Sequence, residues 1–152
     1  MLFRSPSGIV GSITHTDGYC VAVVGLDTEF AAIGVDAERI GYVSSSLWHL
    51  TMRAEELRRL QLLEEPARRQ MATVIFSAKE AFYKCQHALT HRWLEFEDVT
   101  VDVADDAFEA SVVGAIHPIH DMLSPWTGRF KVDETFVVAG IAVKPHGRSW
   151  LP

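Results

Sequence analysis

The chain is poor in cysteine and has no long hydrophobic run. Its 152 residues include two cysteines, Cys20 and Cys85, without the spacing of a disulfide framework. We therefore expect both to be buried free thiols in a reducing compartment. The longest apolar run, residues 136–143, is far shorter than a membrane span, and residues 1–6 lack the apolar core of a signal peptide. These absences predict a cytoplasmic protein that does not cross a membrane.

Positive charge is also scarce. Lysine and arginine number 14 against 20 aspartates and glutamates, for a formal net charge of −6. This balance argues against a nucleic-acid partner, which requires a basic face. An acidic protein partner would likewise have to dock on a local basic or apolar patch. Residues 95–109 contain acidic and no basic side chains, and we interpret them as a solvated face of a sheet.

Several familiar chemical signatures are missing. The chain has no glycine-rich phosphate loop, no dinucleotide-binding fingerprint and no Ser-His-Asp arrangement in a recognisable context. His87 and His91 stand four apart near the end of an expected helix, and His117 and His120 lie in a loop-like stretch. Neither pair has an evident third ligand, so neither predicts a metal site.

The pattern of apolar residues predicts one α+β domain over residues 1–152. The expected strands are 8–14, 19–24, 32–38, 99–103, 108–113, 128–132 and 135–143, and the expected helices are 45–50, 53–63 and 66–89. Thr51 is the expected N-cap of the second helix, and Pro66 opens the third. The apolar stripe of the long helix consists of Met71, Val74, Ile75, Ala78, Phe82, Cys85 and Leu89. We expect an antiparallel sheet to pack on this stripe.

Two short acidic motifs carry the main chemical signal. The first, at residues 34–38, is GVDAE, and a strand directs Asp36 and Glu38 to the same side. The second, at residues 76–84, is FSAKEAFYK, and a helix places Glu80 and Lys84 on one face. Lys79 also lies off the apolar stripe and is expected to be free for chemistry. If the strand meets the helix, three carboxylates and an ammonium group share a site suited to Mg²⁺ and phosphates.

With a third segment, GSITH at residues 11–15, these motifs resemble the 4'-phosphopantetheinyl transferases. The likeness is to the large class, typified by the surfactin- and enterobactin-synthase activating enzymes, and it covers most of residues 8–102. It implies one half of a two-half fold. It also implies Mg²⁺-dependent transfer of 4'-phosphopantetheine from coenzyme A to a serine of an acyl or peptidyl carrier protein, with release of 3',5'-adenosine bisphosphate.

The resemblance also assigns roles to residues. Mg²⁺ is expected to be held by Asp36, Glu38 and Glu80, and Glu80 is the candidate base for the carrier serine. Contacts to coenzyme A are expected from Thr14, His15, Lys79 and Lys84. Lys84 would in addition stabilise the reacting oxyanions, and Lys79 supports either the phosphates or the fold. The family usually has serine at the position of Thr14, which keeps the hydroxyl. The stretch 47–63 resembles the region that meets the carrier protein.

One departure from the family bears on activity. The large class has two similar halves with coenzyme A between them, and this chain begins just before the histidine segment. We expect an N-terminally incomplete chain. The alternatives are a degenerate remnant and a short form that rebuilds the cleft as a homodimer. Two other functions stay open: a non-catalytic module that binds coenzyme A or a carrier protein, and a metal-dependent phosphohydrolase.

Overall fold

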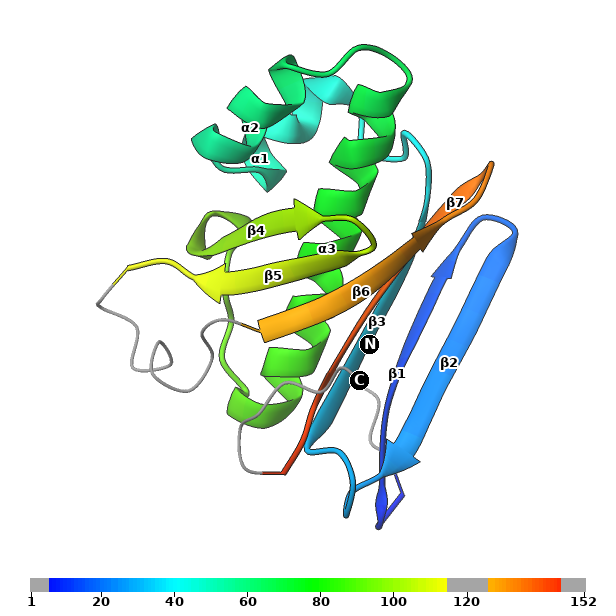
Figure 1. Cartoon of the computed structure of the whole chain (residues 1–152). Coiled ribbons are helices and arrows are strands. Elements are labelled where there is room, and N and C mark those ends of the chain that lie inside the picture. Colours follow the sequence, from blue (N-terminus) through cyan, green and yellow to red (C-terminus); the bar gives the residue numbers. More distant parts are fainter. Residues whose placement is uncertain (1–5, 115–125, 146–152) are drawn as a thin grey trace.

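The computed structural model describes residues 6–114 and 126–145 (Figure 1). The helices are α1 (Trp48–Thr51), α2 (Ala54–Gln61) and α3 (Ala67–Thr90), with short 3-10 turns η1 (Ser45–Leu47) and η2 (Phe96–Asp98). The strands are β1 (Ile9–Thr16), β2 (Tyr19–Leu26), β3 (Ala32–Arg39), β4 (Val99–Ala104), β5 (Ala107–Val112), β6 (Trp126–Val132) and β7 (Phe136–Val143). None of the helices described is long and apolar enough to cross a membrane.

Five strands form an antiparallel sheet in the order β3-β7-β6-β5-β4, and α3 packs across one of its faces (Figure 1). Alternate residues of β7 are buried, as expected for a strand with one face on the core. Phe82 of α3 lies edge-on to Trp126 of β6 with ring centroids 5.3 Å apart. The predicted α+β fold, with an antiparallel sheet on a long helix, is therefore confirmed.

Strand β3 approaches α3 very closely at Gly34. A Cβ atom added to Gly34 would overlap the carbonyl oxygen of Ala81 and lie 2.9 Å from the Cβ of Cys85. Glycine is therefore required for this contact between strand and helix. Because Asp36 is two residues further along β3, the close approach also brings its carboxylate to α3.

The hairpin β1–β2 is attached to the sheet by side chains. β1 and β2 pair from Ile9–Leu26 to Thr16–Tyr19, and β1 lies along the free edge of β3. The N–H groups of Val35 and Ala37 donate to the hydroxyls of Ser12 at 3.0 Å and Thr14 at 3.2 Å. These hydroxyls satisfy edge amides that would otherwise be unpaired.

The outer face of the hairpin corrects one prediction. Cys85 is buried against β3, as expected, but Cys20 is exposed. Val24 and Leu26 of β2 are also exposed, and no described element covers this face. The apolar run of residues 19–24 predicted a strand correctly, but it could not show whether anything packs on it.

Two helix details also differ from expectation. Thr51 ends α1, and its hydroxyl lies 3.4 Å from the carbonyl of Leu47, so it does not cap α2. The N-cap of α2 is Arg53, because Met52 is extended and the helix begins at Ala54. At the end of α3, Leu89 is exposed because the sheet no longer covers the last turn.

Candidate functional site

Asp36 lies where β3 passes α3 and is almost completely buried. Lys84 of α3 donates from Nζ to Asp36 Oδ1 at 2.8 Å and to the carbonyl of Val35 at 3.1 Å. The Thr14 hydroxyl donates to the same Oδ1 at 3.1 Å. The side chain of Asp36 is 3% exposed and that of Lys84 is 29% exposed. A strand, a helix and the hairpin therefore position one carboxylate.

Glu38 and Glu80 are electrostatically coupled to this carboxylate. Burial, followed by the charge of Asp36, raises the pKa of Glu38 from 4.5 to about 7, against smaller lowering contributions from Thr16 and Lys84. Burial and then Asp36 also raise the pKa of Glu80, which Lys84 partly offsets. Three carboxylates and one ammonium group leave an excess of negative charge. The site is therefore electrostatically suited to a cation.

The donor atoms fit a hard divalent ion. Asp36 Oδ2 is buried and has no hydrogen-bond partner among the described residues. A buried carboxylate oxygen without a partner is costly, and a metal ion would satisfy it. Within residues 6–114 and 126–145, however, no three His, Cys, Asp or Glu side chains already stand in metal-binding geometry. Side-chain rotation would be needed for Asp36, Glu38 and Glu80 to share an ion.

The predicted phosphate-binding pair of β1 is divided between two environments. Thr14 is buried and its hydroxyl is committed to Asp36 and Ala37. His15 is exposed, and strand alternation directs it to the face opposite Thr14. Thr14 therefore orients a carboxylate, while the phosphate contact of His15 stays a prediction.

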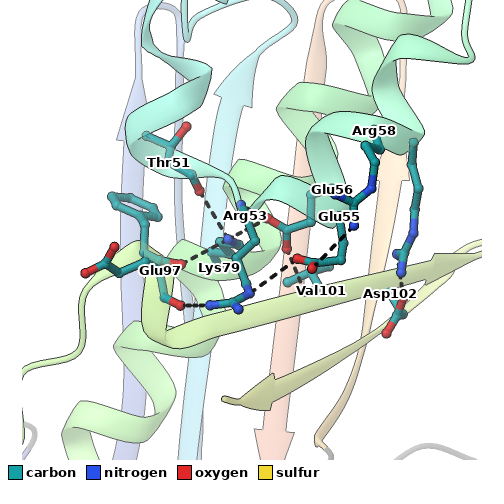
Figure 2. A network of polar contacts seen from close by, with 11 residues as sticks. Thr51, Arg53, Glu55, Glu56, Arg58, Lys79, Glu97, Val101 and Asp102 are labelled. Atoms are coloured by element: carbon teal, nitrogen blue, oxygen red, sulfur yellow. Dashed lines mark hydrogen bonds and ion pairs between the residues drawn. The ribbon is translucent and has the colours of Figure 1, made fainter. Parts of the chain in front are cut away.

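Lys79 lies inside the protein, which corrects the expectation that it is free for chemistry. Its side chain is 2% exposed, and Nζ lies 2.7 Å from Glu56 Oε2. It also donates to the carbonyls of Thr51 at 3.2 Å and Phe96 at 3.0 Å (Figure 2). Burial lowers the pKa of Lys79, and the charge of Glu56 opposes this shift. Of the two roles expected for Lys79, these contacts favour support of the fold.

Glu56 is a partner of this network that was not predicted from the sequence. Its carboxylate accepts from the N–H of Arg53 at 2.7 Å and, on the other oxygen, from the N–H of Val101 at 2.8 Å. A glutamate at the third position of a helix commonly binds the N-cap amide in this way. That spacing could have predicted the contact to Arg53, but not the contacts to Lys79 and Val101.

Two hollows share Glu95 and Phe96 in their linings, and Glu80 lines the smaller of them. A cavity of about 180 Å³ is lined mainly by apolar side chains, and its lining includes Lys79, Glu80, Tyr83, Trp93, Leu94, Glu95, Phe96 and Val99. A more open groove of about 460 Å³ lies between the 49–55 segment and residues 95–97. Phe96 lines both hollows, so a single segment shapes the two.

Within the residues that the structure describes, His87 and His91 have no third metal ligand. The rings of His87 and His91 lie 6.0 Å apart at the end of α3, and His91 has the left-handed backbone conformation of a helix C-cap. Tyr83 stacks near His87 at 5.6 Å, which indicates an aromatic cluster. His117 and His120 lie outside the described residues.

Three known proteins are similar in sequence to most of this chain. The 4'-phosphopantetheinyl transferase Npt of Nocardia iowensis is 30% identical over 148 residues, which are 90% of this chain and 66% of that protein. PptT of Mycobacterium tuberculosis is 35% identical over 126 residues, covering 82% of this chain and 48% of that protein. Svp of Streptomyces mobaraensis is 34% identical over 149 residues, covering 91% and 58%. The chain thus spans about half to two thirds of the length of these relatives.

A solved structure shows the same fold. Holo-[acyl-carrier-protein] synthase of Thermotoga maritima superposes with a TM-score of 0.54 over 75% of this chain and 63% of that one, at 19% identity. Residues 32–139, which include both acidic motifs, match the model of the 4'-phosphopantetheinyl transferase superfamily. The chain therefore belongs to the 4'-phosphopantetheinyl transferase superfamily.

Proposed function

We propose that this chain carries a Mg²⁺-dependent site for transfer of 4'-phosphopantetheine from coenzyme A to a serine of an acyl or peptidyl carrier protein. The observation that carries the proposal is the convergence of Asp36, Glu38 and Glu80 around Lys84, with one oxygen of Asp36 buried and unpaired. Superfamily membership supports the reaction class.

Each charged residue has a distinct task in this proposal. Asp36, Glu38 and Glu80 would hold Mg²⁺, which supplies charge neutralisation to the pyrophosphate. Lys84 places an ammonium group beside the same phosphates. Thr14 holds Asp36 in orientation through its hydroxyl. The contact of His15 to a phosphate of coenzyme A belongs to the proposal as well.

Glu80 is the proposed proton acceptor. The carrier serine forms a bond from its oxygen to the β-phosphorus, its proton passes to Glu80, and the bond to the bridging oxygen breaks. The electron pair leaves with 3',5'-adenosine bisphosphate. Glu80 lines a cavity, which gives the acceptor hydroxyl access to its carboxylate.

Mass spectrometry of a carrier protein tests the proposal. Apo-acyl carrier protein and an apo-peptidyl carrier domain are each incubated with the chain, coenzyme A and MgCl₂. With the wild-type chain, we expect the mass of a carrier to increase by that of one phosphopantetheine group. With Asp36→Asn or Glu80→Gln we expect no increase, although the circular dichroism of the variants is unchanged. Unmodified carriers with the wild-type chain would contradict transfer by this form.

A second candidate is a non-catalytic module that binds coenzyme A or a carrier protein. The absence of a ready-made metal-binding geometry within residues 6–114 and 126–145 favours keeping it. Titration calorimetry with coenzyme A, with and without MgCl₂, separates the two. Binding without any carrier modification would support the module. A cytoplasmic location fits the two free thiols and stays a prediction, as does a homodimer.

A further inference from the structure

A fully buried ion pair lies one residue from the proposed base. Lys79 precedes Glu80 on α3, and its partner Glu56 of α2 is 0% exposed. Successive helix residues are about 100° apart, so Lys79 and Lys84, five apart, point to faces separated by about 140°. Lys84 faces β3 and Asp36, whereas Lys79 faces α1, α2 and η2 (Figure 2).

Every donor of Lys79 and both carboxylate oxygens of Glu56 have partners. An ammonium group has three donors, and those of Lys79 go to Glu56, Thr51 and Phe96. Glu56 accepts from Lys79 and Arg53 on one oxygen and from Val101 on the other. Lys79 therefore has no donor left for a phosphate. Its contacts are with protein only.

The partners of the pair form the walls of the open groove, which shares Glu95 and Phe96 with the cavity that Glu80 lines. One wall is the 49–55 segment, which includes Met52 and Arg53, and the other consists of residues 95–97. Lys79 lies beneath both walls, because it binds a carbonyl from each. Arg53 adds a bridge across the groove to the carbonyl of Glu97. The distance between the walls thus depends on Lys79.

A saturated buried pair is poor evidence for stability alone. Replacing such a pair by apolar side chains of similar volume is often neutral or stabilising. The distinctive property of this pair is that it fixes backbone groups of four elements: the end of α1, the start of α2, η2 and β4. The pair therefore fixes the positions of these four elements relative to one another.

We propose that Lys79 and Glu56 are positioning residues that hold the segment shared by the open groove and the Glu80 cavity, and so set the path by which the acceptor serine reaches Glu80. The inference rests on the proposed function. Asp36 and Lys84, which are proposed to hold Mg²⁺ and the phosphates, lie toward β1 and β3, so the α1–η2 side is left for the approach of the acceptor. Lys79 acts on the acceptor side without touching either substrate.

Steady-state kinetics of two variants test this role. Lys79→Met removes the ammonium, and the double variant Glu56→Gln/Lys79→Met removes both charges so that no buried charge is left unpaired. We expect the KM for the carrier protein to rise by about tenfold or more in both, since small misplacements near a reaction site have large effects. The KM for coenzyme A and the calorimetric affinity for Mg²⁺ should change less than about twofold.

Arg129→Met is the matched control. Arg129 of β6 also makes an ion pair, with Asp106, but these side chains are 48% and 67% exposed and lie outside residues 47–63. Its KM for the carrier should stay near that of the wild type. The inference is overturned if the double variant folds with an unchanged carrier KM. It is equally overturned if the KM for coenzyme A rises as much as that for the carrier.

Backbone amide exchange separates this inference from the proposed function. In the double variant we expect faster exchange in residues 51–56 and 95–97 and at Val101 than in Arg129→Met. Absence of transfer by the wild-type chain would refute the proposed function, and the positioning role would then be judged on exchange alone. Unchanged exchange in those segments would refute the positioning role whether or not transfer occurs.

Discussion

Two lysine–carboxylate pairs involve α3, and they differ in how far protein groups complete their hydrogen bonds. The pair of Lys79 and Glu56 is sealed, and each of its donors and acceptors has a protein partner. The pair of Lys84 and Asp36 is half open, has two further carboxylates beside it and leaves one buried oxygen unpaired. A completed network holds elements in place, whereas an incomplete one can take a ligand.

The largest effect is expected from breaking the sealed pair. Lys79→Met leaves Glu56 buried with its charge unpaired, which should lower the free energy of unfolding by about 3–5 kcal/mol. The exposed control Arg59→Met should cost less than about 1 kcal/mol. Urea unfolding followed by tryptophan fluorescence measures both. Equal losses of unfolding free energy in the two variants would show that burial of the Lys79 pair does not add to stability.

The open pair should be less costly to break. In Lys84→Met, Asp36 loses a charged hydrogen bond worth about 1.5–3 kcal/mol. MgCl₂ should recover part of this loss, because the cation would take the place of the ammonium group. It should recover nothing in Lys79→Met, whose network has no room for an ion. Thermal unfolding with and without MgCl₂ checks this, and recovery in both variants would remove the distinction.

The approach of β3 to α3 can be altered without touching either charge. Gly34→Ala forces a methyl group against Ala81 and should cost about 1–3 kcal/mol while moving Asp36 away from Lys84. Gly140→Ala on neighbouring β7 is the control, since a Cβ there meets nothing nearer than 3.9 Å. Chemical unfolding and Mg²⁺ titration follow the two variants. We expect loss of Mg²⁺ affinity in Gly34→Ala only.

The smallest effect concerns pH. The pKa of Glu38 is raised from 4.5 to about 7 in the folded chain, so the folded state holds a proton that the unfolded state has already released between these values. The stability of the metal-free protein should therefore fall as pH rises from about 4.5 to 7. Glu38→Gln should remove that contribution. Urea midpoints at several pH values measure it, and an identical slope in the variant would contradict the assignment.

Much of the fold could be predicted because the apolar pattern was unambiguous. Each expected strand has a counterpart among β1 to β7, and the long helix was placed within a residue or two. The errors fell where tertiary context decides. Cys20 lies on a strand face that nothing described covers, and Thr51 precedes a two-residue break rather than a helix start.

The candidate site was predictable in part for the same reason. Periodicity alone directs Asp36 and Glu38 to one side of a strand and Glu80 and Lys84 to one side of a helix. It could not show that Thr14 hydrogen bonds to Asp36, since the two residues lie 22 apart in the chain. It also placed Lys79 with the reactive side chains, because a lysine off the apolar stripe is usually exposed.

The sequence by itself determined the superfamily, the α+β architecture and the identity of the charged residues, because local periodicity and motif spacing encode them. The tertiary structure alone decided which lysine is sealed and which is open. That outcome depends on desolvation and on backbone groups from distant segments: Thr51, Phe96 and Val101 complete the hydrogen bonds of one pair, and no described residue completes those of the other.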